Sequence, residues 1–371
     1  MVSPFDARPW ARIARAMLKG ALHLRSGQNV VIETWAHTLQ VAETIGDEAR
    51  GMGIRPTLLY LSESAFLGAP VSVREPGAGA IGPAELAAAA ASNGYILLPG
   101  PDNLDKLGRQ GLVLTRLLGV RRELLTRTLQ QRSIPGVFLI ATLVLTDSTA
   151  RWAGLNPSEL RSESLASSLI QPRAIQRDAK PLAKRLRRGR HLTITHPNGT
   201  RLDLRLAARR PILDDGRVDA QDLASGRVWT TIPSGVLHTT VDERFAEGWF
   251  VANRPSRHMR GAIIGTKWLF SHGHLVHHSI QKGAKLFESA YERAGRERTR
   301  PAFVSIGLNP RIRNFPFAED QERGVVTLYI GGNSDYRGRS AGAFREYALL
   351  RGATVEVDGE PLVKRGRLAS A

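Results

Sequence analysis

The sequence predicts an α/β domain with a parallel sheet, followed by a β-rich domain of the α+β class. Apolar, strand-like runs alternate with helical patterns over the first 160 residues, and short β runs separated by turn residues dominate from residue 191 onward. The chain has 371 residues, enough for two domains at roughly 100–200 residues each. We therefore predict an N-terminal domain at 1–160, a basic helical connection at 161–190 and a C-terminal domain at 191–371.

The elements of the N-terminal domain follow from the spacing of its apolar residues. Amphipathic patterns predict helices at 10–24, 39–52, 84–91 and 113–130. Apolar runs between them predict buried strands at 29–33, 56–61, 95–98 and 137–144. Neither glycine-rich phosphate-binding motif of the nucleotide-binding α/β proteins follows any of these strands. Dinucleotide and nucleoside triphosphate binding are therefore not expected.

The C-terminal half begins with a β-hairpin. Strands at 191–195 and 202–206 flank the turn Pro197-Asn198-Gly199, and Asn-Gly is a strong hairpin signal. Further short β runs predict strands at 261–270, 274–280, 302–306, 325–330 and 353–357, with a helix at 282–294.

The composition excludes several kinds of site. The chain has no cysteine, so disulfides, zinc–thiolate sites, iron–sulfur clusters and a cysteine nucleophile are ruled out. The longest apolar run, Ile134 to Leu145, is shorter than the roughly 20 residues that a membrane-spanning helix needs. The N-terminus lacks the pattern of a signal peptide. We expect a cytoplasmic protein without a membrane partner.

The net charge of +18 is unevenly distributed, since residues 181–210 hold nine Lys or Arg and one Asp. Such a patch is typical of proteins that neutralise nucleic-acid phosphates. The aromatic residues that would stack on bases are absent from this segment. We favour a solvated helix face here and keep nucleic-acid binding as an alternative.

Several local motifs occur in a fixed order along nearly the whole chain. They are Gly27-Gln28-Asn29, the run Lys184–Leu206, Ile232-Pro233-Ser234-Gly235, Ile306–Pro310, Gly324–Gly331 and Val355–Gly359. In this combination the sequence resembles the aminopeptidase T family of metallopeptidases and its relative 2,5-dihydroxypyridine 5,6-dioxygenase. The resemblance implies an N-terminal α/β domain beside a β-rich C-terminal domain, usually in a dimer, with a metal site in the second domain.

The positions that the resemblance assigns to metal ligands hold other side chains. The peptidase ligands correspond to Val236, Phe303, Thr327, Phe344 and Glu346, and the dioxygenase iron triad corresponds to Phe303, Phe344 and Glu346. A divalent cation needs oxygen or nitrogen lone pairs at about 2 Å, which Val and Phe lack. We therefore expect no metal and no other cofactor, on a scaffold whose fold persists.

Side chains two residues apart on a strand share a face, which predicts a replacement pocket. His238 shares a face with Val236, Tyr329 with Thr327, and Phe344 with Glu346, so these residues and Phe303 are expected to line an apolar cavity. Within it, His238 and Glu346 are a candidate acid/base dyad. The alternative is that His238 is only hydrogen-bonded inside a β core.

Three further candidates follow the Gly-Leu-Asn-Pro turn near this pocket. Asn309, Arg311 and Arg313 lie on one loop, and guanidinium groups suit the carboxylate of a peptide C-terminus or an acidic side chain.

Two other motifs attract attention. His272, His274 and His278 have even spacing and could form a metal-binding comb on one face, although Ser-His-Gly-His is also typical of an exposed hairpin tip. Gly338-Arg339-Ser340-Ala341-Gly342 matches the nucleophile-elbow pattern, but no His follows it, so we interpret it as a loop.

Three functional hypotheses result. The first is a degenerate, metal-free aminopeptidase-like protein that binds a peptide or peptide-like ligand, as a homodimer or as the partner of an active paralogue, for example in the maturation of a peptide natural product. The second is an enzyme with a rebuilt site, either a hydrolase or cyclase that uses His238 and Glu346, or a ring-cleaving dioxygenase relative. The third is nucleic-acid binding through residues 181–210.

Overall fold

The structure is a computed structural model that divides into two compact units. It describes residues 5–68, 80–102, 111–140, 146, 157–258, 261–313, 315–342 and 344–369. The N-terminal unit comprises Met1–Leu169 and Gly216–Ser234, and the C-terminal unit comprises Ile170–Asp215 and Gly235–Ala371. The predicted domain boundaries differ from this division, because residues 216–234 return to the N-terminal unit after the chain has entered the C-terminal one.

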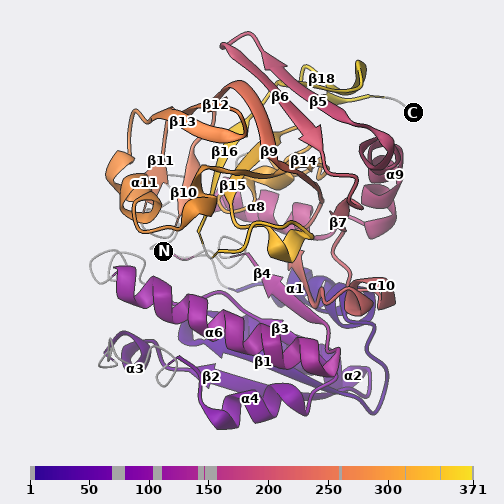
Figure 1. Cartoon of the computed structure of the whole chain (residues 1–371). Helices are drawn as coiled ribbons and strands as arrows, with labels where there is room; N and C mark the ends of the chain where they lie inside the picture. The colour runs from indigo at the N-terminus through magenta and orange to yellow at the C-terminus, as the bar shows by residue number, and fades with distance from the viewer. Residues whose placement is uncertain are drawn as a thin grey trace. The chain divides into compact units, whose positions relative to one another are not determined.

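The N-terminal unit is built on a five-stranded parallel sheet (Figure 1). In spatial order its strands are β2 (Arg55–Leu61), β1 (Asn29–Trp35), β3 (Gly94–Leu97), β4 (Gly136–Leu139) and β8 (Trp229–Ile232). The predicted parallel α/β sheet is thereby confirmed. The sequence did not predict β8, which is separated from β4 by part of the C-terminal unit.

Helices cover both faces of this sheet because its strands are apolar on both sides. Ile32 packs with the helices α1 (Ala7–Arg15), η1 (Ala16–Ala21, a π-helix) and α2 (Leu39–Gly51). Its neighbour Val31 points to the other face and packs with α4 (Pro83–Ala90) and α6 (Gly111–Arg132). The described part of this unit also contains α3 (Glu63–Gly68), α8 (Pro157–Ser168), α10 (Ala220–Ala224) and the short helix η2 (Ala36–Thr38).

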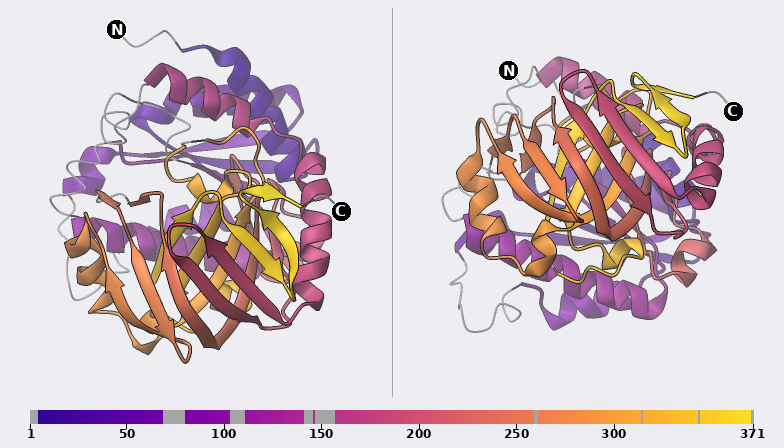
Figure 2. Two further views of the ribbon diagram at one scale, coloured as in Figure 1. Left: turned by 90° about the horizontal axis from the view of Figure 1, so that it is seen from above. Right: turned by 45° about the horizontal axis from the view of Figure 1, so that its top comes forward.

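The C-terminal unit is built on antiparallel strands (Figure 2). Their order is β16 (Arg345–Leu350), β15 (Val326–Gly331), β14 (Pro301–Gly307), β9 (Val236–Val251), β6 (Thr200–Leu206), β5 (His191–His196), β17 (Thr354–Val357), β18 (Glu360–Lys364) and β19 (Arg367–Leu368). Also attached are β7 (Ile212–Asp214) and β12 (Lys267–Ser271), which pair with β9, and β13 (His274–Ser279), which pairs with β12. A separate ribbon joins β10 (Ser256–His258) to β11 (Gly261–Ile263), and the helices are α9 (Pro172–Arg188) and α11 (Ala284–Tyr291).

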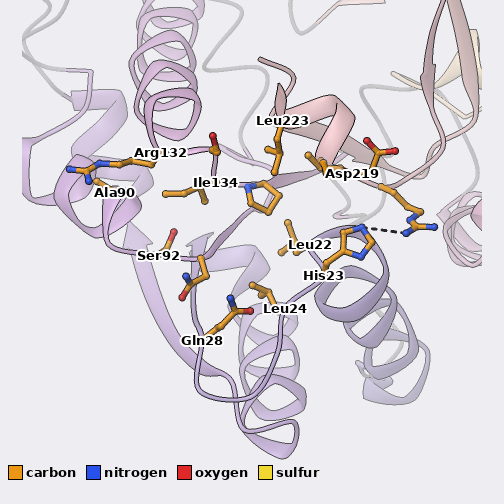
Figure 3. A pocket seen from close by; sticks show the side chains of 16 residues that line it. Leu22, His23, Leu24, Gln28, Ala90, Ser92, Arg132, Ile134, Asp219 and Leu223 are labelled. Carbon is orange, nitrogen blue, oxygen red and sulfur yellow. Dashed lines mark hydrogen bonds between the residues drawn. The ribbon is translucent and has the colours of Figure 1, made fainter. Parts of the chain in front are cut away.

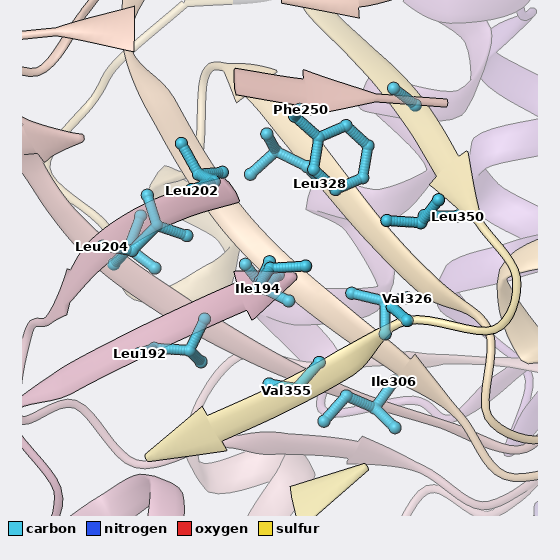
Figure 4. Close-up of a cluster of buried hydrophobic side chains, with 14 of the residues drawn as sticks. Leu192, Ile194, Leu202, Leu204, Phe250, Ile306, Val326, Leu328, Leu350 and Val355 are labelled. Carbon is cyan, nitrogen blue, oxygen red and sulfur yellow. The ribbon is translucent and has the colours of Figure 1, made fainter. Parts of the chain in front are cut away.

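The long strand β9 connects the two halves of this unit. Its first residues pair with β7 and β14, and its last residues pair with β6 and β12. Apolar side chains from both halves meet in one core, which Figure 4 shows with Leu192 and Ile194 near Val326 and Leu328. Gly248 has φ 107°, and a Cβ there would lie 2.1 Å from the Arg201 carbonyl oxygen. A glycine is therefore required where β9 crosses β6.

Most of the predicted strands are present, with two exceptions. The hairpin 191–206 is confirmed, with Gly199 at φ 97° in its turn. The single strand predicted at 261–270 is wrong, because a bend at Gly265 (φ 71°) separates β11 from β12. The strand predicted at 137–144 ends at Leu139, and 141–145 lie outside the described residues. Among the described residues, no helix combines the length and the apolar character needed to cross a membrane.

Candidate functional site

Five of the predicted pocket residues lie on one face of the C-terminal sheet, which we call the polar-aromatic face. They are Val236, His238, Phe303, Thr327 and Tyr329. The strand register places them together, because Ser305 of β14 pairs with both His238 and Thr327, and Phe303 pairs with Tyr329. Cross-strand partners point to the same side of a sheet. The other face carries the apolar core.

The centre of the polar-aromatic face is filled by aromatic rings. Phe303 is 1% exposed and is stacked between Tyr329 and Tyr336, with ring centroids 4.1 Å from its own on each side. The Arg345 guanidinium lies 5.3 Å from the Phe303 ring centroid. Both faces of the Phe303 ring are therefore covered by other aromatic rings.

His238 is buried and hydrogen-bonded within this face. Its Nδ1 lies 2.6 Å from the Ser305 hydroxyl oxygen, and its ring makes edge contacts with Phe303 and Tyr336 at 5.7 Å and 4.9 Å. The neighbouring Thr327 hydroxyl is buried and has no hydrogen-bond partner among the described residues. The hydrogen bond favours a core role for His238 over that of a free base.

A buried carboxyl group, that of Glu319, and a half-buried one, that of Asp320, lie beside the face on the short helix η5 (Glu319–Gln321). The Tyr329 hydroxyl donates to Asp320 Oδ2 at 2.9 Å, and burial, together with the charge of Asp214, raises the pKa of Asp320 to about 6. Arg257 donates to Glu319 Oε1 at 2.8 Å, yet burial still raises the pKa of Glu319 to about 7.

The predicted dyad of His238 and Glu346 is not formed. Glu346 pairs with Ile330 in the register of β15 and β16, so it lies on the core face, opposite His238. Its Oε1 is 3.0 Å from Nε2 of His258. The residue that joins the polar-aromatic face is Tyr347, the cross-strand partner of Tyr329. A prediction that shifts β16 by one residue places each of its side chains on the opposite face of the sheet, which explains the error.

Phe344 is displaced for the same reason. It packs against the core of the C-terminal unit, with its ring centroid 5.9 Å from that of Tyr291. It does not accompany Phe303 as the sequence predicted.

The three loop candidates have unequal roles. Asn309 is fully buried, and its Oδ1 accepts a hydrogen bond from the Arg311 backbone N–H at 3.0 Å, so it fixes the turn. The side chains of Arg311 and Arg313 are exposed. The backbone carbonyl of Arg313 accepts hydrogen bonds from Arg254 and Arg351. Nothing in these contacts brings either guanidinium into the polar-aromatic face.

A concave site that the sequence did not predict lies elsewhere in the C-terminal unit. This arginine cavity has a volume of about 570 Å³, within the range usual for ligand sites. Its lining includes five arginines and three acidic residues: Arg209, Asp242, Glu243, Arg244, Arg296, Glu297, Arg300 and Arg339, together with Ala207, Ser340 and Ala341. The lining therefore carries a net positive charge.

Ion pairs occupy part of this lining and leave part of it available. Arg209 donates to both Glu243 oxygens, at 2.7 Å and 3.1 Å. These bonds and the backbone N–H of Arg339 outweigh burial and lower the pKa of Glu243 to about 2. Arg296 and Arg339 are exposed, and among the described residues neither guanidinium has an acidic partner. These two arginines are thus the groups best placed to bind an anion.

The loop that carries Ser340 is held by buried polar contacts. Asn333 is fully buried, and its Oδ1 accepts a hydrogen bond from the Ser340 backbone N–H at 2.9 Å. The segment connects β15 to β16 without forming the strand–turn–helix of a nucleophile elbow. The interpretation of Gly338–Gly342 as a loop is confirmed.

The histidine run forms the tip of a hairpin, and its histidines do not line up on one face of a strand. His272 and Gly273 occupy the turn between β12 and β13, with φ 50° and 73°. A β-bulge then shifts the register between Leu269 and Phe270. As a result His278 faces Phe287, at a centroid distance of 4.9 Å, whereas His274 lies near Thr299. The bulge therefore overturns the predicted alignment of His274 and His278.

The residues at the implied metal position do not fit a divalent cation. Val236 and Phe303 offer no lone pairs. The donors that remain on the face are one imidazole and the hydroxyl groups of Ser305, Thr327 and Tyr329, and the Asp320 carboxyl beside it is hydrogen-bonded to Tyr329. Hard and borderline cations are bound by carboxylates and several imidazoles. Within the part of the chain that the structure describes, no three His, Asp or Glu side chains form a metal-binding group.

The fold formed by these two units, an α/β unit and an antiparallel β-rich unit, is that of aminopeptidase T. AmpT from Thermus thermophilus matches with a TM-score of 0.71 and 18% sequence identity over 98% of this chain and 99% of that one. The 2,5-dihydroxypyridine dioxygenase of Pseudomonas putida KT2440 matches with a TM-score of 0.64 and 14% identity over 99% of both chains. No protein-family model and no curated protein sequence matches. At these identities the similarity establishes the fold.

Proposed function

We propose that this protein binds a peptide or peptide-like ligand on an aminopeptidase T fold and lacks that family's metal centre. One observation carries the proposal. Phe303, at a position where the resemblance implies a metal ligand, is stacked on both faces by tyrosine rings at 4.1 Å. A ring so packed supplies neither lone pairs nor space for an ion.

The arginine cavity is the binding place that we assign to the ligand. Its unpaired guanidiniums, Arg296 and Arg339, suit the carboxylates of a peptide, namely its C-terminus or acidic side chains. Glu297 on the same lining is an acceptor for a peptide N–H or ammonium group. These charges of both signs support a peptide ligand over a simple polyanion.

A role as a non-catalytic subunit agrees with this proposal. A fold that is retained while its implied ligand positions change is typical of proteins that keep an interaction and lose a reaction. We propose a homodimer or a heterodimer with an active paralogue, in a setting such as the maturation of a peptide natural product. Light scattering on the purified chain, alone and mixed with an active paralogue, measures this.

The binding test uses fluorescein-labelled hexapeptides that end in two glutamates with a free C-terminus, followed by fluorescence polarisation. A charge-assisted hydrogen bond contributes enough that Arg339→Gln or Arg296→Gln should each weaken binding about tenfold. Arg201→Gln, an exposed arginine outside the cavity, is the matched control and should bind as the wild type does. Mass spectrometry of the peptide after incubation with Zn²⁺ or Co²⁺ should recover it intact.

Three results would contradict the proposal. The first is equal binding by the wild type and both cavity variants. The second is cleavage of the peptide with one tightly bound metal ion per chain. The third is preference for a 20-nucleotide oligonucleotide with a steep salt dependence, which would instead favour the basic segment 181–210.

A further inference from the structure

A second concave site lies in the N-terminal unit, at the edge of the parallel sheet where the strands begin. Its volume is about 680 Å³, which suits a small-molecule ligand. Figure 3 shows that its walls come from the segments that lead into β1, β3, β4 and β8. Open α/β sheets usually bind ligands at the opposite, carboxyl edge, so the fold alone does not predict this cavity.

The cavity combines an apolar wall with hydrogen-bond donors. Leu22, Leu24, Ile134 and Leu223 supply the apolar surface (Figure 3). An apolar wall of this kind suits a branched aliphatic or aromatic group.

Two amide side chains are oriented so that they donate. The Arg25 backbone N–H donates to Gln28 Oε1 at 2.7 Å, and the Asn29 backbone N–H donates to Asn93 Oδ1 at 2.9 Å. Because each carbonyl oxygen is engaged, the NH₂ group is the available end of each side chain. Among the described residues neither NH₂ group meets an acceptor.

The charges of the lining favour an anion. Arg132 is exposed at the rim and has no acidic partner among the described residues. The acidic lining residue, Asp219, already accepts the backbone N–H groups of Gln221 and Asp222 at 2.8 Å and 2.9 Å, as the N-cap of α10. The lining therefore has two guanidiniums, Arg132 and Arg217, of which Arg217 lies 3.5 Å from His23 Nε2, and the NH₂ groups of Gln28 and Asn93 add two donors. Such a set of donors suits a carboxylate.

Two helices end beside the cavity. His23 has φ 54° and Ser133 has φ 52°, the left-handed conformation that commonly follows the last turn of a helix, and the Ile134 backbone N–H donates to the Leu129 carbonyl. We propose that this cavity binds a small carboxylate with an apolar group, either as a free acid or as the C-terminal residue of a peptide. This site is distinct from the arginine cavity, so the two proposals fail or succeed independently.

The test titrates the full chain with N-acetyl-leucine and with N-acetyl-leucinamide, which has the same apolar group but no charge, using calorimetry and saturation-transfer NMR. The acid should bind at least about tenfold more tightly than the amide. Arg132→Gln should remove most of that preference, and Leu223→Trp, which fills the cavity, should weaken both ligands. Arg127→Gln is the matched control, because Arg127 lies on the same helix, is exposed and is absent from the lining.

Equal affinity for acid and amide would overturn the proposal, as would wild-type affinity in both cavity variants. An equal loss in Arg127→Gln and Arg132→Gln would also overturn it, because the effect would then be one of net charge. Comparison with N-acetyl-Ala-Ala-Leu identifies the source of the carboxylate. Tighter binding of the tripeptide supports a peptide terminus, and unchanged or weaker binding supports a free acid.

Discussion

Each unit places a carboxylate against a tyrosine, and in the N-terminal unit a guanidinium also bonds to that carboxylate. Glu33 of β1 is 2% exposed, accepts the Tyr95 hydroxyl at 2.6 Å and lies 2.9 Å from Arg121. In the C-terminal unit Asp320 accepts the Tyr329 hydroxyl at 2.9 Å, and burial raises its pKa to about 6. A guanidinium therefore meets the first carboxylate, whereas burial biases the second towards its neutral form.

This difference follows from the groups that surround each carboxylate. Buried ionised carboxylates are tolerated where a cation meets them. Beside Asp320 the polar-aromatic face offers the stacked rings of Phe303 and Tyr336. Around Asp320 the C-terminal unit therefore packs aromatic rings, although the unit also has ion pairs of its own, such as Arg209–Glu243 and Arg257–Glu319.

The largest expected effect on stability comes from breaking the buried ion pairs of Arg121 in the N-terminal unit. Arg121→Met would leave Glu33 and Glu85 without their shared guanidinium, and loss of one partner of a buried ion pair costs about 4 kcal/mol. Urea denaturation measures the free energy of unfolding. Arg127→Met on the same helix, where the pair with Glu123 is exposed, should cost less than about 0.5 kcal/mol. Similar losses in the two variants would show that the Glu33 network is not desolvated as described.

The next largest effect comes from the packing of Phe303 in the polar-aromatic face. Phe303→Ala removes a ring packed between Tyr329 and Tyr336 and should lower the free energy of unfolding by about 3 kcal/mol. Phe303→Leu, which keeps most of the volume, should cost about 1 kcal/mol. If the alanine variant unfolds at the same urea concentration as the wild type, the ring does not fill the face.

The sequence predicted much of this fold because its signals are local. The alternation of strands and helices in the first 140 residues and the Asn198-Gly199 turn identify elements without any knowledge of their partners. It could not predict that β8 joins the N-terminal sheet, because that pairing bridges nearly 90 residues of chain from β4.

The candidate site was predicted only in part, for a related reason. Spacing along one strand shows that His238 shares a face with Val236, but the register between strands decides which residues they meet. That register brings Ser305 and Tyr329 to the same face and sends Glu346 to the other one. Tyr347, which is adjacent to Glu346, therefore takes the position on this face that we predicted for Glu346.

A smaller effect concerns how the free energy of unfolding depends on pH through Asp320. The pKa of Asp320 is raised from 3.8 to about 6, so between pH 4 and pH 6 the folded state binds more protons than the unfolded state. Its contribution to stability is complete below pH 4 and is lost as the pH rises through about 6, by on the order of 2 kcal/mol. Asp320→Asn keeps an acceptor for Tyr329 and removes this loss.

Urea denaturation of the wild type and of Asp320→Asn at pH 4.5 and pH 7.5 measures this prediction. The variant should be the more stable of the two at pH 7.5 and should have lost that advantage at pH 4.5. A difference that is the same at both pH values would mean that Asp320 is ionised throughout.

The smallest effect concerns the exposed histidines at the hairpin tip, whose imidazoles can bind a metal ion, in contrast to the buried imidazole of His238. His272 and His274 are exposed, so replacing both with alanine should change the free energy of unfolding by less than about 0.5 kcal/mol. Exposed imidazoles bind Ni²⁺ without a built site, and the untagged double variant should elute from nickel resin at a lower imidazole concentration than the wild type. His238→Asn should leave the elution unchanged, because aromatic rings enclose that imidazole. An elution shift in His238→Asn alone would mean that the polar-aromatic face still admits a metal ion.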